Sequence, residues 1–497
     1  MELEKFLYRY FGFSAFRQGQ KETIQALLNG QNTLAMLPTG TGKSLCYQLP
    51  AYLLKKTTIV VSPLLSLMQD QVEQMKVRGE KSVIALNSFM SPDQKREALR
   101  QLQTFRFIFL SPEMLSVPNV LSAIRNLQIG LFVVDEAHCI SQWGYDFRPD
   151  YLKLGFIRKK LGNPLTLALT ATATSEVRED IKKRLNMEGA MEIISSVNRQ
   201  NISLMIQTFH TYHEKQVQLL ELVKKLQPPG IIYFKSKKAA ELTASYLKER
   251  GIGKVEYYHG GMEQEQRILI QQQFLNSQIN IICATSAFGM GINKENVRYV
   301  IHFHPPGDME SYVQEIGRAG RDGKQSTAIL LYAEGDEGIP LTLLEQEFPS
   351  KEQIDWLFEK IDKQVHLQKN ALDDYFGQIG LNEIQSRIVS YFLEDCHDVR
   401  DVKASLLSYI QHRKEVKMEK LRFVMRWIQS KDCRRKGILD YFHEHKLVQT
   451  PCCDRCDDSM IMCTAQMEPM DDASPLEQEA WQQELAKILL TEKIGSI

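Results

Sequence analysis

Short, mostly apolar runs alternate with helical patterns along the first two thirds of the chain. One series of such runs occurs at 57–62, 107–111, 130–134 and 166–170, and a second at 230–234, 254–258, 280–285 and 299–303. Unbroken apolar runs of this length are typical of parallel strands that are buried on both faces. Helical patterns such as residues 92–103 lie between them. The chain is therefore predicted to be α/β, with two doubly wound parallel-sheet lobes joined near residues 195–210.

The pattern changes after about residue 340, where strands give way to helical periodicity. Helices are predicted within 354–376, 382–396 and 399–428, and this helical region ends in a cluster of cysteines. The segment that follows is acidic and then weakly helical from Pro475. The predicted domains are two α/β lobes at 1–197 and 198–338, a helical domain at 339–465 and a tail at 466–497.

A loop rich in small residues follows the apolar run at 34–37, with the sequence Thr39-Gly40-Thr41-Gly42-Lys43-Ser44. Small residues let backbone N–H groups turn toward a polyphosphate, Lys43 can pair with the β- and γ-phosphates, and the Ser44 hydroxyl can bind Mg²⁺. Pro38 stands where the strict phosphate-loop pattern has its first glycine. The alternative is an ordinary turn between a strand and a helix.

Two carboxylates follow another predicted strand, at Asp135 and Glu136. Ligands of open α/β sheets bind at the carboxyl ends of the strands, so these side chains are expected near the phosphate loop. Asp135 suits a water-mediated contact to Mg²⁺, and Glu136 suits activation of an attacking water as a general base. Either could instead belong to solvated surface.

These motifs resemble those of superfamily 2 helicases, and ordered motifs continue from about residue 11 to residue 325. Residues 137–149, Ala-His-Cys-Ile-Ser-Gln-Trp-Gly-Tyr-Asp-Phe-Arg-Pro, resemble the aromatic-rich loop of the RecQ family of DNA helicases. The resemblance implies two tandem RecA-like lobes with ATP between them, followed by a helical zinc-binding subdomain. It also implies a short bacterial form that lacks the winged-helix and HRDC domains of larger RecQ proteins.

The resemblance implies further residues at the nucleotide. In residues 11–20, Phe13 would stack on the base, Arg17 would lie against the nucleotide, and Gln20 would read the adenine edge through its amide. Residues 311–323 resemble motif VI, whose arginines neutralise charge on the γ-phosphate in the transition state. Arg321 is the first candidate for this arginine finger and Arg318 the second. An ordinary ion pair between the lobes is the alternative for both.

The family's DNA contacts fall on several other segments. Residues 62–71 resemble motif Ia, in which Ser62 and Ser66 would contact strand phosphates. Residues 170–173 resemble motif III, and residues 284–293 resemble motif V. In the aromatic-rich loop, Trp143 and Phe147 can stack on unpaired bases and Arg148 can pair with phosphate, with His138 grouped beside them. The alternative for Trp143 is a place in the core.

Cysteine positions favour a metal over disulfides. Four of the nine cysteines, Cys433, Cys452, Cys453 and Cys456, lie close together in sequence near the end of the helical region. In a cytoplasmic chain such a cluster with a C-x₂-C pair indicates Zn²⁺. Many bacterial relatives have a C-x₂-C-x₂-C run, whose last cysteine would fall at Ser459 counting from Cys453. Some use two adjacent cysteines instead, which Cys452-Cys453 would match, and Cys463, His443 or His445 remain alternatives for one ligand. The site would stabilise the helical domain rather than catalyse.

Charge and hydropathy mainly exclude classes of protein. Lys and Arg number 61, Asp and Glu also number 61, and the pI is about 7.2, so any basic track for nucleic acid must be local. The N-terminus lacks the apolar core of a secretory signal, and no run approaches the length of a membrane span. The expected location is the cytoplasm, at a bacterial nucleoid.

The predicted activity is ATP-dependent 3′→5′ unwinding of DNA in recombination, repair or replication, with the polarity implied by the resemblance alone. The expected partners are single-stranded DNA and tailed or forked duplexes, and the expected state is a monomer; single-strand-binding or recombination proteins are candidate partners that the sequence does not specify. The alternatives are a DNA-stimulated translocase without efficient unwinding and an RNA helicase. A non-catalytic DNA-binding scaffold and a metabolite kinase fit the motifs less well.

The aromatic-rich loop gives a direct test of the predicted DNA sensor. Trp143→Ala should leave ATP binding intact and reduce the stimulation of ATPase activity by DNA, because base stacking on Trp143 contributes roughly 1–3 kcal/mol. Nucleotide binding and ATPase rates with and without single-stranded DNA measure the two effects. Undiminished stimulation would remove this loop from the mechanism.

Overall fold

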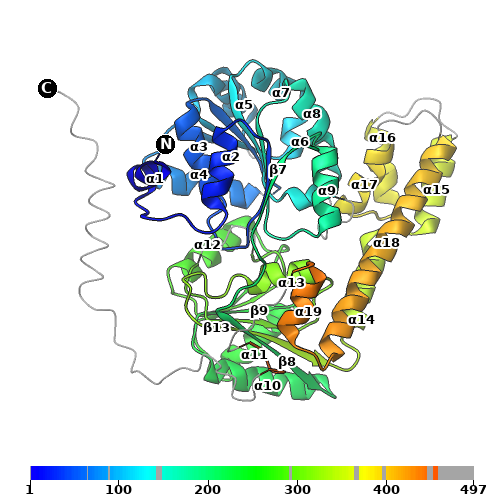
Figure 1. Cartoon of the computed structure of the whole chain (residues 1–497). Helices are drawn as coiled ribbons and strands as arrows, with labels where there is room; N and C mark the ends of the chain where they lie inside the picture. The colour runs from blue at the N-terminus through cyan, green and yellow to red at the C-terminus, as the bar shows by residue number, and fades with distance from the viewer. Residues whose placement is uncertain are drawn as a thin grey trace. The chain divides into compact units, whose positions relative to one another are not determined.

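The computed structural model describes residues 2–63, 65–87, 90–141, 148–289, 294–362, 369–393, 399–444 and 452–456. Within them, two parallel sheets and a set of C-terminal helices follow one another along the chain (Figure 1). The fold class expected from the sequence is confirmed. None of the described helices is long and apolar enough to cross a membrane.

The first lobe is built on a seven-stranded parallel sheet in the order β3-β4-β2-β5-β6-β1-β7. Its strands are β1 (Thr33–Met36), β2 (Thr57–Val61), β3 (Val83–Leu86), β4 (Phe107–Leu110), β5 (Ile129–Val134), β6 (Thr166–Thr170) and β7 (Met191–Ile194). Its helices are α1 (Leu3–Phe11), α2 (Gln20–Leu28), α3 (Leu45–Leu54), α4 (Leu65–Val77), α5 (Pro92–Arg100), α6 (Pro112–Leu115), α7 (Pro118–Arg125), α8 (Leu154–Lys160) and α9 (Ser175–Arg184).

Helices cover both faces of this sheet, which explains why the middle positions of its central strands are apolar. Side chains of α2, α3 and α4 pack on one face, around residues such as Leu27, Tyr47 and Met68. Helices α5, α7, α8 and α9 pack on the other face, around residues such as Ile124 and Ile181. A strand covered on both faces must be apolar at every position, not at alternate ones.

The second lobe repeats the design with a six-stranded parallel sheet in the order β10-β11-β9-β12-β13-β8. Its strands are β8 (Ile202–Phe209), β9 (Gly230–Tyr233), β10 (Val255–Tyr258), β11 (Ile281–Ala284), β12 (Tyr299–His302) and β13 (Ser326–Ala333). Its helices are α10 (Tyr212–Lys225), α11 (Lys237–Glu249), α12 (Gln264–Leu275) and α13 (Met309–Ile316). The segment between β7 and β8, residues 195–201, connects the lobes.

Six helices follow the second sheet: α14 (Gly338–Glu347), α15 (Lys351–Asp362), α16 (Lys369–Gln378), α17 (Glu383–Leu393), α18 (Val399–Gln429) and α19 (Arg434–Tyr441). The first five form an apolar core of their own, centred on residues such as Leu357 and Leu406. The far end of α18 and helix α19 instead join the core beneath the second sheet, through Trp427 and Leu439. The helical region is thus anchored to the second lobe.

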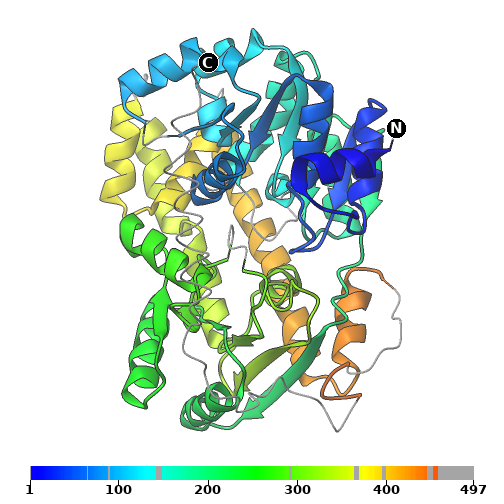
Figure 2. The ribbon, with the colours of Figure 1, turned by 90° about the vertical axis from the view of Figure 1, so that its left-hand side faces the viewer.

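Residues 452–456 pack against β8, the edge strand of the second sheet (Figure 2). Leu204 forms a parallel bridge with Cys453, the Leu204 N–H donates to the Cys452 carbonyl at 3.3 Å, and the Asp454 N–H donates to the Leu204 carbonyl at 3.0 Å. Unpaired edge strands expose backbone donors and acceptors, so this segment partly covers the edge.

Candidate functional site

The loop after β1 turns sharply at two glycines before α3 begins. Gly40 and Gly42 have φ angles of +86° and +75°, a region that L side chains rarely adopt. The loop lines a cavity of about 290 Å³ together with Asp135, Glu136 and the arginines that follow α13. Residues from both lobes therefore meet at the carboxyl ends of the first sheet, where ligands of such sheets bind.

Lys43, Asp135 and Glu136 lie together on the first-lobe side of this cavity. The Lys43 Nζ lies 3.6 Å from the Glu136 Oε1, and the Glu136 N–H donates to the Asp135 Oδ1 at 2.9 Å. Glu136 has a φ of +47°, a strained conformation for a residue with a side chain. Backbone strain of this kind is common at functional sites, where the fold fixes the position of a reacting side chain.

The two carboxylates have opposite electrostatic surroundings. Burial and then the charge of Glu136 raise the pKa of Asp135 to about 6. Burial alone would raise the pKa of Glu136, but the charges of Lys43, His138 and Arg318 outweigh burial and hold it below its usual value. Glu136 is thus a stable anion inside the cavity, facing cations from both lobes.

His138 is 1% exposed and lies against Glu136, although the sequence analysis grouped it with a DNA-contacting loop. Its Nδ1 lies 3.5 Å from the Glu136 Oε2 and 3.0 Å from the Thr170 Oγ1. The Thr170 hydroxyl in turn donates to the Thr172 carbonyl at 3.1 Å. A buried polar network therefore joins the carboxylate to residues 170–173, the segment that resembles motif III.

Two arginines reach the phosphate loop from the second lobe. Both follow α13: Arg318 is 5% exposed and donates to the Gly289 carbonyl, and the aliphatic part of Arg321 packs against Gly40. Burial and then the charges of Arg318 and Arg199 lower the pKa of Arg321 to about 9. The cavity has more basic than acidic side chains among its lining residues, with Arg17, Lys43, Arg78, Arg318 and Arg321 against Asp135, Glu136 and Glu295. A polyphosphate anion would balance this excess.

The residues expected around the adenine lie on the first-lobe side of the cavity. Phe13 is 51% exposed, whereas Phe11 and Phe16 pack against the small core formed by α1, α2 and α3. The Gln20 amide donates to the Thr41 carbonyl at 2.6 Å and the Gly42 carbonyl at 3.1 Å, and its oxygen accepts the Arg17 N–H at 2.8 Å. Gln20 therefore braces the phosphate loop in this structure, and Arg17 donates to the Gly40 carbonyl.

A second cavity of about 570 Å³ lies where the first lobe, α12 and α17 approach one another. Arg148 and Pro63 line it from the first lobe, Arg267 from α12 and Arg387 from α17, and Arg148 donates to the Pro63 carbonyl at 2.8 Å. Nearby, the Ser62 hydroxyl is buried and has no hydrogen-bond partner among the described residues. Trp143, Phe147, residues 290–293 and the side chain of Ser66 lie outside the described residues.

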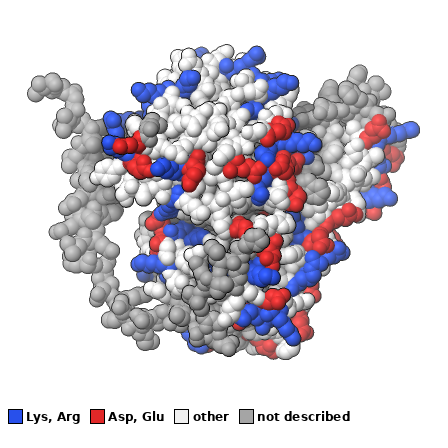
Figure 3. All heavy atoms as spheres, viewed as in Figure 1, with Lys and Arg blue, Asp and Glu red and all other residues white. Residues whose placement is uncertain are grey.

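Basic and acidic side chains are interspersed on the face of the molecule shown in Figure 3. No broad basic patch marks a nucleic-acid surface among the described residues on that face. This agrees with the equal numbers of basic and acidic residues in the chain, from which any basic track for nucleic acid is expected to be local.

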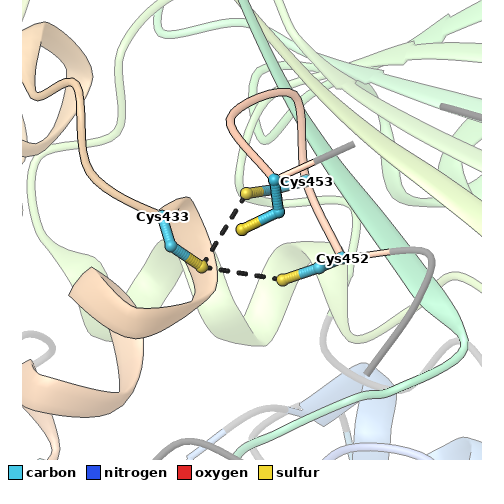
Figure 4. Close-up of side chains that lie close together, drawn as sticks. Cys433, Cys452 and Cys453 are labelled. Carbon is cyan, nitrogen blue, oxygen red and sulfur yellow. Dashed lines mark hydrogen bonds between the residues drawn. The ribbon is translucent and has the colours of Figure 1, made fainter. Parts of the chain in front are cut away.

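Four cysteines form a separate cluster between α19 and β8. The sulfur atoms of Cys433, Cys452, Cys453 and Cys456 all lie within 4.8 Å of one another, and those of Cys433, Cys452 and Cys453 face each other in Figure 4. Cys433 Sγ lies 3.6 Å from Cys452 Sγ and 3.8 Å from Cys453 Sγ. Tetrahedral zinc with thiolates at about 2.3 Å requires sulfur separations of about 3.8 Å, so the cluster fits Zn²⁺.

The chemistry around the sulfurs also fits a cation. Burial and the neighbouring sulfurs of Cys433 and Cys453 raise the pKa of Cys456 to about 12, so without a metal this thiol stays protonated. The Arg434 N–H donates to Cys453 Sγ at 3.3 Å and the Lys436 N–H donates to Cys433 Sγ at 3.4 Å, as expected around metal-bound thiolates. His443 is not part of the cluster; His445 and Cys463 lie outside the described residues.

Three protein-family models match the chain. The DEAD/DEAH box helicase model covers residues 17–181, the helicase conserved C-terminal domain covers 214–323, and the RecQ zinc-binding model covers 386–458. The chain is 42% identical to the Probable ATP-dependent DNA helicase RecS of Bacillus subtilis, over 100% of this chain and 99% of the relative. The chain belongs to the RecQ family of ATP-dependent DNA helicases. As a member of this family, the chain uses ATP with Mg²⁺, and it binds Zn²⁺ at its cysteine cluster.

Other RecQ relatives are longer than this chain. The ATP-dependent DNA helicase RecQ of Haemophilus influenzae is 34% identical over 90% of this chain, and that of Bacillus subtilis is 37% identical over 72%. The alignments cover 62% and 61% of those relatives, respectively.

Solved structures show the same fold at low identity. The DUF1998 helicase MrfA bound to DNA matches with a TM-score of 0.56 at 18% identity, covering 69% of this chain and 52% of MrfA. The DEAD-box helicase Mss116 bound to single-stranded RNA matches with a TM-score of 0.55 at 16% identity, covering 84% of this chain and 89% of Mss116.

Three residues near the site were not predicted from the sequence: Thr170, Arg199 and Arg435. Thr170 was noted only within a motif, and its contact with His138 depends on the pairing of neighbouring strands. Arg199 and Arg435 make backbone contacts across domain boundaries, which no local spacing encodes. A lone arginine in a linker carries no signal that distinguishes it from surface charge.

Loss of one cysteine tests the metal centre. Cys456→Ser should reduce bound zinc from about one ion per chain to near zero and lower the thermal unfolding temperature, because metal binding and local folding are coupled. Metal analysis and thermal denaturation measure the two effects. Cys283→Ala, which removes a buried thiol outside the cluster, should keep its zinc. Full zinc content in Cys456→Ser would assign the fourth ligand elsewhere.

Proposed function

We propose that this RecQ-family helicase translocates 3′→5′ along single-stranded DNA and unwinds tailed or forked duplexes in recombination, repair or replication, acting at the bacterial nucleoid. The observation that carries the proposal is the convergence of Lys43 and Glu136 from one lobe with Arg318 and Arg321 from the other on one cavity. A site divided between two lobes ties nucleotide chemistry to relative lobe motion.

Each residue has a role in this proposal. Lys43 and the backbone of the phosphate loop bind the β- and γ-phosphates, with Ser44 and Asp135 serving the Mg²⁺. Glu136, held ionised by the surrounding cations, accepts a proton from the attacking water. Arg321, and next Arg318, neutralise charge that develops on the γ-phosphate, an effect worth about 10³-fold or more in rate.

The groove that contains Arg148, Arg267 and Arg387 supports a path for the DNA strand next to motif Ia. Three carboxylates also line it, and one of them, Glu113, forms an ion pair with Arg387 at 3.4 Å. The groove is formed by elements of both lobes and by the helical domain, so a strand bound there would contact parts that move relative to one another during the ATP cycle. Contacts through guanidinium groups to phosphates are independent of base sequence. Aromatic stacking by Trp143 and Phe147 would add the recognition of unpaired bases.

A second candidate function is a DNA-stimulated translocase that remodels complexes without efficient unwinding. It would use the same two-lobe ATPase site and would differ in showing DNA-stimulated ATPase activity without strand separation. An RNA helicase would use the same ATPase chemistry and would differ from a DNA helicase in the nucleic acid that stimulates it.

ATPase activity is the first test of the proposed function. Single-stranded DNA should stimulate the steady-state rate more strongly than RNA, and Glu136→Gln should abolish the stimulated rate because it removes the general base while keeping the shape. The measurement compares no nucleic acid, single-stranded DNA, duplex DNA and RNA. The proposal would be contradicted if only RNA stimulated the ATPase rate, or if none of the nucleic acids did.

Polarity and unwinding need a second measurement. Duplexes with a 3′ single-stranded tail should be unwound in the presence of ATP and Mg²⁺, whereas blunt duplexes and those with a 5′ tail should remain paired. Strand separation followed by fluorescence distinguishes these substrates. Robust DNA-stimulated ATPase without strand separation on any substrate would favour the translocase, and unwinding from a 5′ tail would reverse the assigned polarity.

A further inference from the structure

Arg199 lies in the segment between β7 and β8 and donates to backbone carbonyls of both lobes. Its guanidinium donates to Thr39 in the phosphate loop at 3.1 Å and to Gly317, Ala319 and Gly320 in the second lobe at 3.0, 3.0 and 2.7 Å. One side chain in the linker thus joins the loop that binds phosphate to the segment that carries Arg318 and Arg321.

The three second-lobe carbonyls lie just beyond the end of α13. Gly317 caps α13, and Ala319 and Gly320 lie in the buried turn that follows, where backbone carbonyls need hydrogen-bond partners. A guanidinium is a favourable partner for these groups because it is cationic and presents five donors in a rigid, planar fork. Arg199 therefore holds in place the turn from which both candidate arginine fingers project.

The lobes are in close contact at the same point, where glycines leave room for the approach. A Cβ added at Gly317 would lie 2.1 Å from the Thr39 Oγ1, and a Cβ added at Gly40 would lie 2.7 Å from the Arg321 Cγ. Both are far inside contact distance. The position of the arginines relative to the phosphate loop thus depends on this contact, which Arg199 spans.

The backbone of Arg199 is itself held by the zinc-binding region. Arg435, which is 4% exposed, donates to the Arg199 carbonyl at 2.9 Å and to the Asn198 Oδ1 at 2.8 Å. Arg435 lies two residues after Cys433, one of the four clustered cysteines. The amide of Asn201 adds donors to the Gly320 and Lys324 carbonyls, at 2.7 and 2.8 Å. The linker is therefore a fixed support and Arg199 projects from it.

From these contacts we infer that Arg199 is a positioning residue for ATP hydrolysis, which docks the segment bearing Arg318 and Arg321 onto the phosphate loop. Arg199 does not line the 290 Å³ cavity, so it acts through the residues that do. The inference rests on the proposed ATPase function, because positioning has a consequence only where those arginines act on a transferring phosphoryl group.

The test separates catalysis from nucleotide binding and from stability. Arg199→Gln should lower the kcat of the single-stranded-DNA-stimulated ATPase about tenfold or more, because misplacement of catalytic groups by about 1 Å can cost on the order of a hundredfold. The affinity for a fluorescent ATP analogue, measured directly in the full-length protein, should change by no more than about twofold. Arg199→Lys should recover little of the rate, since an ammonium cannot donate to four carbonyls in this geometry.

Arg158 offers a matched control within one lobe. It is 3% exposed and donates to the carbonyls of Leu185 and Asn186 at 3.2 and 3.1 Å, all inside the first lobe. Arg158→Gln should lower the thermal unfolding temperature and leave kcat close to that of the wild type. A purely structural role for Arg199 would give the same result as this control.

Gly317→Ala perturbs the same contact from the other lobe and keeps Arg199, so it serves if Arg199→Gln does not fold. It should also lower kcat more than it lowers nucleotide affinity. A normal kcat in folded Arg199→Gln, or in folded Gly317→Ala, would overturn the inference. A wild-type protein without DNA-stimulated ATPase would instead overturn the proposed function, so the two failures are distinguishable.

Discussion

Positive charge from two lobes converges on the loop after β1, and much of the remaining structure holds that charge in place. Lys43 comes from the loop itself, and Arg318 and Arg321 enter from beyond α13. Glu136 is held ionised among these cations, while the pKa of Arg321 is lowered by burial and by its neighbours' charges. Such an arrangement is electrostatically incomplete, and a polyphosphate completes it. Binding energy from the phosphates can then draw the lobes together.

The conformation of the first lobe prepares its half of the site. Glu136 adopts a left-handed conformation after β5, whose last four residues are buried. His138 lies against its carboxylate and is itself hydrogen-bonded to Thr170. This network reaches residues 170–173 on the neighbouring strand's end, so a change at the γ-phosphate has a short physical route to the next segment of the lobe. The route runs from the Glu136 carboxylate through its 3.5 Å contact with His138, and then through the hydrogen bonds from His138 to Thr170 and from Thr170 to Thr172.

The zinc-binding region contacts both the second sheet and the linker between the lobes. The cysteine cluster fixes the start of α19 to residues 452–456, and those residues pair with the edge of the second sheet. Two residues after Cys433, Arg435 holds the linker that joins the lobes. A structural metal placed here stabilises the helical region and the linker at the same time. The RecQ-type zinc domain is therefore adjacent to the ATPase machinery in space, although hundreds of residues separate them in sequence.

The amino-acid sequence by itself indicated the two α/β lobes, the helical third region, the family and the cofactors, because strand burial and phosphate binding impose local patterns that can be recognised. It missed β3, β7, β8 and β13: β3, β7 and β8 include partly exposed positions, and β13 is apolar but was not distinguished from its surroundings. The roles of Arg199 and Arg435, and the burial of His138 against Glu136, were decided only by the tertiary structure. Their partners are backbone carbonyls and side chains that the fold brings together from distant segments, and backbone carbonyls are the same in every sequence.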